Sequence, residues 1–314
     1  MAHYSRPDQN IWKGRFSLDS HYIYQKVDFV DLEKPELIHG DEKIAFLGYQ
    51  CDEGVRRNQG REGAKGAPDI IRTALSTFAN HLSDTTALMD CGNVSCGDQD
   101  MEQAHALISE KVKILLDQNC LPILFGGGHD LAYAHFRGIK KHLSTSSKVG
   151  IINLDAHFDL RQVEGRGNSG TPFNQIASET DEFHYLCLGI QPQVNHKGLY
   201  ATAEQLGVQY LEMDAFQVAN WTQISSLIEN FISEVDHIYL TVDMDGFSSA
   251  YAPGVSAPSP LGFEPHIVRN TLSLIKASKK LISADIVELN PKFDQDSRTA
   301  KLAAWVGYEL LHHF

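Results

Sequence analysis

The sequence has no apolar stretch long enough to cross a membrane as a helix, and its first residues, MAHYSRPDQN, lack the apolar core of a secretory signal. It also lacks an excess of positive charge. Its 27 lysines and arginines stand against 40 aspartates and glutamates, which gives a formal net charge of −13. Nucleic acids and anionic membrane surfaces are bound through basic patches, so both are excluded as partners. We therefore expect a cytoplasmic protein.

Cysteine is scarce, and no linker-like segment interrupts the chain. The five cysteines are odd in number and scattered in or beside apolar segments, which favours reduced thiols in the core over a disulfide framework. No proline- and serine-rich stretch, charge block or low-complexity segment marks a boundary. We expect one domain over residues 1–314, with residues 1–40 as an N-terminal arm packed on the body.

Short apolar segments rich in β-branched residues recur along the chain and alternate with helical patterns. The expected strands lie near residues 43–49, 85–90, 121–125, 149–155, 184–189, 208–213, 237–243 and 281–288. Strands that alternate with helices are typical of α/β proteins. The pattern predicts a three-layer α/β/α sandwich around a mainly parallel sheet of about eight strands.

Three of these strands run directly into side chains that bind metals. LPILF leads into GGGHD (126–130), VGIINL into DAHFD (155–159), and IYLTV into DMD (243–245). In open α/β sheets, ligands gather beyond the carboxyl ends of parallel strands, and side chains two positions apart on an extended segment share a face. Six side chains should therefore meet at one rim of the sheet: His129, Asp155, His157, Asp159, Asp243 and Asp245.

Four carboxylates and two imidazoles can balance the charge of two divalent ions. A pair of such ions lowers the pKa of a bridging water from about 16 to about 7, and the resulting hydroxide is the expected nucleophile. Oxygen-rich ligation with imidazole and no thiolate suits Mn²⁺, two per chain, although zinc, cobalt or nickel could compete. GGGHD alone could be a simple helix start, but three such motifs at strand ends favour a metal site.

A fourth strand, in LISADIVELNP (281–291), carries Asp285 and Glu288 near its end. A buried carboxylate such as that of Glu288 is stabilised by a planar amidinium or guanidinium, so we assign Glu288 to contact with a cationic substrate group. Asp285 could instead orient a metal-binding histidine through a hydrogen bond.

These motifs, in this order, resemble those of the arginase or ureohydrolase superfamily, whose members hydrolyse C–N bonds of guanidino or amidino groups at a binuclear manganese site. The segments DEGVRRNQGREGAKGAP (52–68), NSGTPF (168–173) and YAPGVSAPSPLGF (251–263) are similar to its formimidoylglutamase branch. The resemblance covers nearly the whole chain. Arginases carry a histidine in the loop after the second ligand motif, and NSGTPF has none, which argues against arginase itself.

The resemblance implies hydrolysis of N-formimidoyl-L-glutamate to L-glutamate and formamide, by attack of the bridging hydroxide on the formimidoyl carbon. It implies two catalytic carboxylates. Glu288 would hold the amidinium charge, and Asp159 would touch the nucleophile and pass a proton to the leaving amine. The superfamily also implies a homo-oligomer.

The two carboxylates of that substrate need cationic or hydroxyl partners. Five side chains within the segments 52–68 and 168–173 are candidates: Arg57, Asn58, Arg61, Ser169 and Thr171. For the arginines, a structural role in a glycine-rich turn is an open alternative. The prolines of YAPGVSAPSP stiffen a loop directly after the DMD ligands, where a rim for the substrate is expected.

Two other functions remain open. Another ureohydrolase (agmatinase, guanidino-acid hydrolase or arginase) would use the same metals with a different rim. A non-catalytic arginase-like binding protein belongs to a different class, but a carboxylate cluster with no cation to bind would only cost stability.

Overall fold

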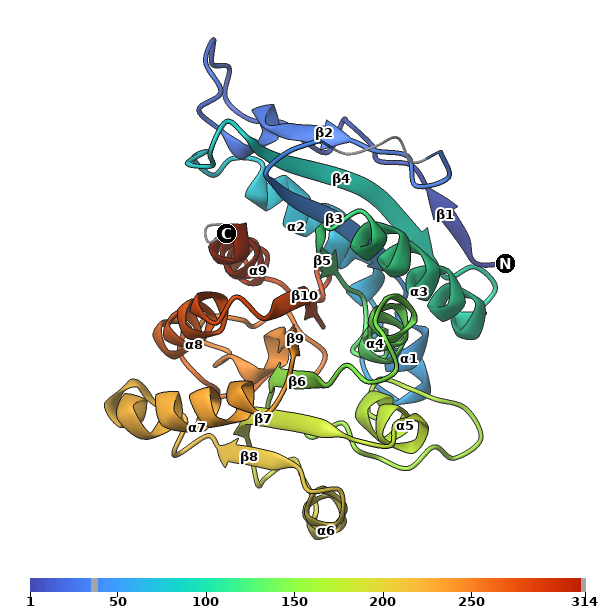
Figure 1. Ribbon diagram of the computed structural model, residues 1–314, viewed down its shortest axis with the longest axis vertical. Helices are drawn as coiled ribbons and strands as arrows, with labels where there is room; N and C mark the ends of the chain where they lie inside the picture. The colour runs from blue at the N-terminus through green and yellow to red at the C-terminus, as the bar shows by residue number, and fades with distance from the viewer. Residues whose placement is uncertain (35–38, 312–314) are drawn as a thin grey trace.

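The computed structural model describes residues 1–34 and 39–311, and within these ranges ten strands form one sheet (Figure 1). The strands are β1 (His3–Ser5), β2 (Val27–Phe29), β3 (Glu42–Gln50), β4 (Thr86–Ser95), β5 (Leu121–Phe125), β6 (Val149–Leu154), β7 (His184–Ile190), β8 (Gln209–Glu212), β9 (His237–Asp243) and β10 (Leu281–Val287). The strands β3 to β10 correspond to the eight expected from the sequence, and the α/β fold class is confirmed.

The sheet runs in the order β1-β4-β3-β5-β10-β9-β6-β7-β8. All pairs between β3 and β8 along this path are parallel. The strands at the centre are buried on both faces, which explains their continuous apolar runs: every residue of β5 and of β6 is buried. Because these strands are parallel, their carboxyl ends all meet at one edge of the sheet.

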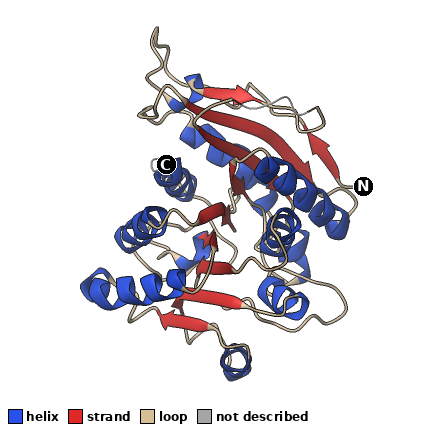
Figure 2. Ribbon diagram, in the orientation of Figure 1, coloured by secondary structure: helices blue, strands red, loops and turns tan. Residues whose placement is uncertain are grey.

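Helices cover both faces of the sheet (Figure 2). They are α1 (Glu53–Arg57), α2 (Ala67–Leu75), α3 (Met101–Asp117), α4 (Leu131–His142), α5 (Pro172–Glu179), α6 (Lys197–Gln205), α7 (Trp221–Ser233), α8 (Pro265–Ala277) and α9 (Arg298–Leu311). One apolar core contains side chains of α2, α7, α8 and α9, and a second contains side chains of α3, α4, α5 and α6. Two cores on opposite faces of one sheet make the three layers.

The first part of the N-terminal arm adds two strands to the edge of the sheet. β1 pairs antiparallel with the end of β4, and β2 pairs parallel with its beginning. Within residues 1–40, positions 35–38 lie outside the described residues.

A buried polar cluster fastens the arm to the sheet. Arg72 of α2 donates to Asp90 of β4 at 2.8 Å, and both side chains are 1% exposed. The indole Nε1 of Trp12 donates to the other carboxylate oxygen of Asp90 at 2.7 Å, while its ring stacks on Phe46. A buried carboxylate is stable only when its oxygens are paired, so the arm completes this ion pair.

The five cysteines all lie in the described part of the chain and form no disulfide. Four of them are buried and Cys96 is half-buried, as expected for reduced core thiols. None of the described helices combines the length and the apolar character needed to span a bilayer.

Candidate metal centre

The six predicted ligands follow three of four neighbouring strands, β5, β10, β9 and β6, at their carboxyl ends. Asp155 comes directly after β6, Asp243 is the last residue of β9, and His129 lies in the turn between β5 and α4. Glu288 directly follows β10, between two of these strands. The parallel order of the central sheet thus collects side chains that are more than one hundred residues apart in the sequence.

A first group of ligand atoms surrounds the buried ring of His129. Its Nδ1 lies 3.0 Å from a carboxylate oxygen of Asp159, 3.0 Å from one of Asp243 and 3.2 Å from one of Asp155. One donor atom of each of these four residues lies within 4.8 Å of the others. This is the spacing of a set of ligands around a single ion.

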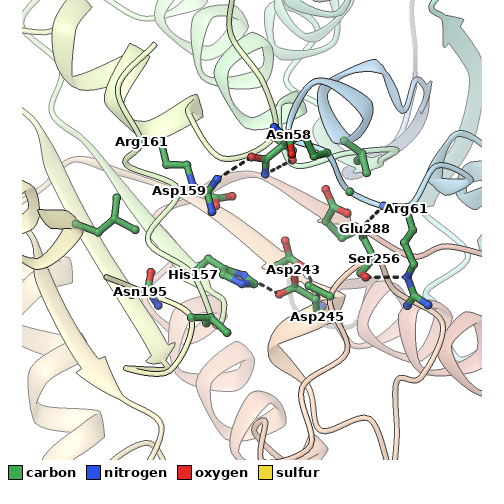
Figure 3. Close-up of a pocket in the computed structure, with 17 residues that line it drawn as sticks. Asn58, Arg61, His157, Asp159, Arg161, Asn195, Asp243, Asp245, Ser256 and Glu288 are labelled. Atoms are coloured by element: carbon green, nitrogen blue, oxygen red, sulfur yellow. Dashed lines mark hydrogen bonds and ion pairs between the residues drawn. The ribbon is translucent and has the colours of Figure 1, made fainter. Parts of the chain in front are cut away.

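A second group shares Asp155 with the first. His157 Nδ1 lies 3.3 Å from Asp245 Oδ1 (Figure 3) and 3.4 Å from Asp155 Oδ1. The three ligand atoms again lie within 4.8 Å of one another. The shared carboxylate places the two groups side by side. The structure therefore brings all six predicted ligands together as two adjoining groups.

Unpaired buried atoms show that this site suits a pair of cations. His129 Nδ1 and Asp245 Oδ1 have no solvent contact and no partner with hydrogen-bond geometry among the described residues. The other ring nitrogen of His129 lies 3.0 Å from the hydroxyl of Thr241, which fixes the orientation of the ring and leaves Nδ1 facing the carboxylates. A set of carboxylates and imidazoles without thiolate fits two divalent cations.

The pKa shifts of the ligand side chains also indicate a site for cations. Burial, together with the nearby charges of Asp245 and Asp155, raises the pKa of Asp243 well above its usual range. Burial alone would lower the pKa of His129, but its interactions with the surrounding carboxylates outweigh burial and raise it. The carboxylates are thus packed closely enough that they need positive charge between them.

Hydrogen bonds from the backbone hold the carboxylates in place. Asp155 Oδ1 accepts the backbone N–H of His157 at 2.7 Å, and Asp243 Oδ1 accepts that of Asp245 at 2.7 Å. Asp155 Oδ2 also accepts from the side-chain amide of Asn153 at 2.9 Å. Each aspartate therefore closes a local turn at its strand end, which fixes the ligand before any ion binds.

Glu288 is a buried carboxylate beside the ligands. Its Oε1 accepts the backbone N–H of His129 at 2.9 Å. Burial, and then the charge of Asp245, raise the pKa of Glu288 to about 8. The remaining oxygen of this carboxylate is available to a cationic group, which would remove the cost of burying the charge.

The ligands open onto a cavity of about 320 Å³ (Figure 3). It is lined by Val55, Asn58, Gln59, Gly60, Arg61, His157, Asp159, Arg161, Ser169, Val194, Asn195, Leu199, Asp243, Asp245, Ser256, Ala257 and Glu288. Ser256 and Ala257 belong to the proline-rich loop after the DMD motif, which lies at the rim as expected. The volume suits a small molecule.

Of the five side chains expected to bind substrate carboxylates, the structure brings three to this cavity. Asn58, Arg61 and Ser169 line it. Arg57 does not, because its guanidinium is engaged by Glu53 at 2.8 Å and by Glu102 at 2.7 Å.

Thr171 does not line the cavity either. It is fully buried, and its hydroxyl lies 2.8 Å from Gln175 Oε1 and 2.9 Å from the backbone nitrogen of Asn168, at the start of α5. The expectation that Arg57 and Thr171 face the substrate is therefore corrected, because both side chains hold neighbouring loops together.

Arg61 reaches the cavity, but its guanidinium is already occupied. Its Nε donates to the backbone carbonyl of Ser256 at 2.9 Å, its Nη2 donates to that of Val255, and the group lies 3.9 Å above the ring of Phe293. Arg61 thus fastens the rim loop to the segment after α1.

Sequence reasoning missed one cation of the cavity, Arg161. It lies two residues beyond the DAHFD motif, and its Nη1 donates to Asn58 Oδ1 at 3.1 Å. The signal was its closeness in sequence to Asp159. A lone arginine in a polar loop carries no pattern that shows which way it points.

Asp285 lies away from the ligands and contacts a different histidine. Its Oδ2 is 2.7 Å from Nδ1 of His135, whose Nε2 is 2.5 Å from the hydroxyl of Ser283. The alternative that Asp285 orients a metal-binding histidine is therefore wrong. The three side chains have the order of a hydrolase triad, but all are fully buried, so no substrate reaches them.

Comparison with known proteins agrees with this geometry. A model of the arginase family matches residues 42–313. The formimidoylglutamase of Aeromonas salmonicida (strain A449) is 41% identical over 318 residues, which cover 99% of this chain and 99% of the relative. That of Geobacillus sp. (strain WCH70) is 40% identical and covers 99% of this chain and 97% of the relative.

Solved structures share the fold. The formimidoylglutamase from Bacillus subtilis subsp. subtilis str. 168 gives a TM-score of 0.81 at 23% identity, over 95% of this chain and 93% of that one. Trypanosoma cruzi formiminoglutamase with Mn²⁺ gives 0.76 at 22% identity, over 86% of this chain and 93% of that one. With a family model spanning most of the sequence and relatives matched along nearly their whole length, this chain belongs to the arginase family.

Proposed function

We propose that this protein is a metal-dependent hydrolase that cleaves the C–N bond of N-formimidoyl-L-glutamate to give L-glutamate and formamide. The observation that carries the proposal is the pair of adjoining ligand groups, open to the same cavity as the buried carboxylate of Glu288. The choice of substrate follows the name formimidoylglutamase, which the relatives matched along nearly their whole length carry.

The six ligands would hold two Mn²⁺ ions per chain. His129, Asp159 and Asp243 belong to one group, His157 and Asp245 to the other, and Asp155 to both. Ions held there would lower the pKa of water to about 7 and so would supply a hydroxide nucleophile at neutral pH. Zinc, cobalt and nickel suit the same donors, so manganese is part of the proposal.

Glu288 and Asp159 carry the remaining chemistry. The Glu288 carboxylate accepts hydrogen bonds from the amidinium of the substrate, which orients the formimidoyl carbon over the ligand groups and stabilises its positive charge. Asp159 belongs to one ligand group and lines the cavity, which supports a role in passing a proton to the departing amine.

The substrate is a small amidine with carboxylates, and Asn58 and Ser169 offer polar contacts to it from the cavity wall. We also propose that the enzyme is cytoplasmic and forms a homo-oligomer, and that it binds neither nucleic acids nor membranes.

A substrate panel tests the function. The purified protein is stripped with a chelator and assayed with and without Mn²⁺ against N-formimidoyl-L-glutamate, agmatine, arginine and a guanidino acid. We expect formamide release from the first compound only, loss of activity on chelation, and recovery with Mn²⁺. Parallel recoveries with Zn²⁺, Co²⁺ and Ni²⁺ measure the preference for metal.

Other outcomes point to the other functions. Urea release would identify an enzyme acting on guanidino compounds and overturn the proposed substrate. Full activity after thorough chelation would overturn the metal dependence. Inactivity on every compound with Mn²⁺ present would leave a non-catalytic binding protein.

A further inference from the structure

We propose that Arg161 selects the substrate by binding one of its carboxylates, with Asn58 and Ser169 as partners. This inference rests on the proposed function and deepens it, because it names the group that recognises the glutamate part of the substrate.

The arginines around the cavity differ in what their guanidinium groups contact. The guanidinium of Arg57 is paired with two glutamates. That of Arg61 donates to backbone carbonyls and lies over the ring of Phe293. Arg161 has no carboxylate within ion-pair distance in residues 1–34 and 39–311, and one donor of its guanidinium is bonded, to Asn58. An arginine has five N–H donors, so most donors of Arg161, which lines the cavity, have no partner among the described residues.

The loop that carries Arg161 is fixed at its base. The backbone N–H of Arg161 donates to the carbonyl of Gly170 at 2.9 Å. The side chains of Arg161 and Asn58 pass close to Gly170, where an added Cβ would lie 3.1 Å from Arg161 Cδ and 3.2 Å from Asn58 Nδ2. The guanidinium is therefore placed by backbone contacts and has room because residue 170 lacks a side chain.

Asn58 links the arginine to a second donor. Its Oδ1 accepts from Arg161, and its Nδ2 donates to the hydroxyl oxygen of Ser169 at 3.1 Å. Since Ser169 accepts in this bond, its own hydroxyl proton is available to an outside acceptor. Apart from the bond from Arg161 to Asn58, the guanidinium and the hydroxyl offer donors that no described residue accepts, which is the chemistry of a carboxylate-binding site.

Charges of both signs line the cavity. The ligand carboxylates and Glu288 supply negative charge for an amidinium, while Arg161 supplies positive charge for an anion. In Figure 3 the Arg161–Asn58 pair lies apart from Glu288 and from the Arg61–Ser256 pair. A substrate with a cation at one end and a carboxylate at the other can pair with Glu288 and with Arg161, whereas a diamine derivative such as agmatine has no carboxylate for the guanidinium.

The experiment compares Arg161→Gln with the wild type on three formimidoyl compounds. N-formimidoyl-L-glutamate carries both carboxylates, the 4-aminobutyrate derivative lacks the α-carboxylate, and the L-norvaline derivative lacks the γ-carboxylate. We expect Arg161→Gln to lower kcat/KM by about 10- to 100-fold, mainly through KM, because a charge-assisted hydrogen bond is lost. That loss should occur for N-formimidoyl-L-glutamate and for one of the two analogues, which identifies the carboxylate bound.

Arg166→Gln is the matched control, since Arg166 lies in the same loop, is exposed and pairs with Glu102. It should behave as the wild type. An equal loss on all three compounds, or no change on any, would overturn the role of Arg161 while the activity of the wild type upholds the function. A wild type that is inactive on N-formimidoyl-L-glutamate would overturn the function, and the inference with it.

Discussion

At the scale of single residues, two carboxylates of the site hold backbone conformations that most residues avoid. Asp159 has a φ of 47° and Glu288 a φ of 64°. Left-handed backbone costs free energy for residues other than glycine, and it persists where the surrounding structure enforces it. Both positions lie in segments that follow a strand of the sheet, and both carboxylates line the cavity.

Asp159→Asn tests the role of this carboxylate in catalysis. Asparagine tolerates left-handed backbone as well as aspartate does, so the fold should be kept. The variant has no group that can carry the proton, and we expect kcat to fall by about 10²- to 10⁴-fold in steady-state assays with saturating Mn²⁺.

The exposed Asp181 gives the control. It precedes the amino end of β7, whereas the ligands lie at the carboxyl ends of the parallel strands, so Asp181→Asn should leave kcat unchanged. Bound metal is counted in each variant by elemental analysis. A kcat for Asp159→Asn close to that of the wild type, at full metal content, would exclude Asp159 as the proton carrier.

The residue scale also shows what the sequence could and could not predict. The six ligands were predictable because their place follows from strand ends in a parallel sheet, which local pattern reveals. The arginines were not. Arg57 and Arg161 differ in their partners, Glu102 and Asn58, and those partners come from distant segments. Arg57 also pairs with the nearby Glu53, but the partners that separate it from Arg161 are set by tertiary contacts.

At the scale of elements, long strands were easier to predict than short ones. The strands β3 to β10 carry apolar runs that mark them, whereas β1 and β2 have three residues each, too few for any alternation to show. Their existence depends on β4, whose ten residues leave room for one partner at each end of the same edge. Short edge strands of this kind are set by the neighbour that they join.

The helix α8 contains a charge on its buried face. Lys276 follows Val268 and Leu272 at intervals of four, is buried with them, and donates through Nζ to the carbonyl of Glu309 in α9. Burial lowers the pKa of Lys276 from 10.5 to about 8. The folded protein therefore loses this proton at a lower pH than the unfolded chain does.

This shift predicts the pH dependence of stability. Between about pH 8 and 10.5 the unfolded chain binds more protons at this site than the folded protein, so Lys276 becomes less unfavourable to folding as pH rises. We expect the free energy of unfolding of Lys276→Met, measured relative to the wild type by urea titration, to fall steadily across this window.

Below pH 8 the difference between variant and wild type should be constant. Lys301→Met on α9 removes an exposed lysine and serves as the control, with no trend expected. A difference for Lys276→Met that stays flat from pH 7 to 10.5 would contradict the lowered pKa.

At the scale of the whole molecule, the N-terminal arm and the catalytic edge are held by different parts of the sheet. The arm pairs with β4 and fills the polar cluster of Asp90, whereas the ligands follow β5, β6 and β9. Loss of the arm contacts should therefore act on stability and leave the chemistry of the folded enzyme intact.

Trp12 provides the test of this separation. Trp12→Phe keeps an aromatic ring against Phe46 but removes the donor to Asp90, and we expect a loss of about 1–3 kcal/mol in the free energy of unfolding. Trp12→Ala also loses the ring, for which about 3–5 kcal/mol is expected. Both are measured by urea unfolding at neutral pH.

Phe16→Ala, in the same arm but 86% exposed, is the control and should change stability by less than about 0.5 kcal/mol. The kcat per folded molecule should stay at the wild-type value in all three variants. A fall in kcat that tracks the loss of stability would show that the arm and the catalytic edge are coupled.

The residues that line the cavity come from two kinds of segment, and this difference affects how such proteins diverge in evolution. The ligands stand on strand ends anchored in the buried sheet, while Asn58, Arg161 and Ser256 stand on connecting segments at the surface. Surface connections accept substitution and insertion far more readily than a buried sheet does. A descendant of this enzyme can therefore change its specificity among amidines through substitutions in these three loops, while the metal ligands stay the same.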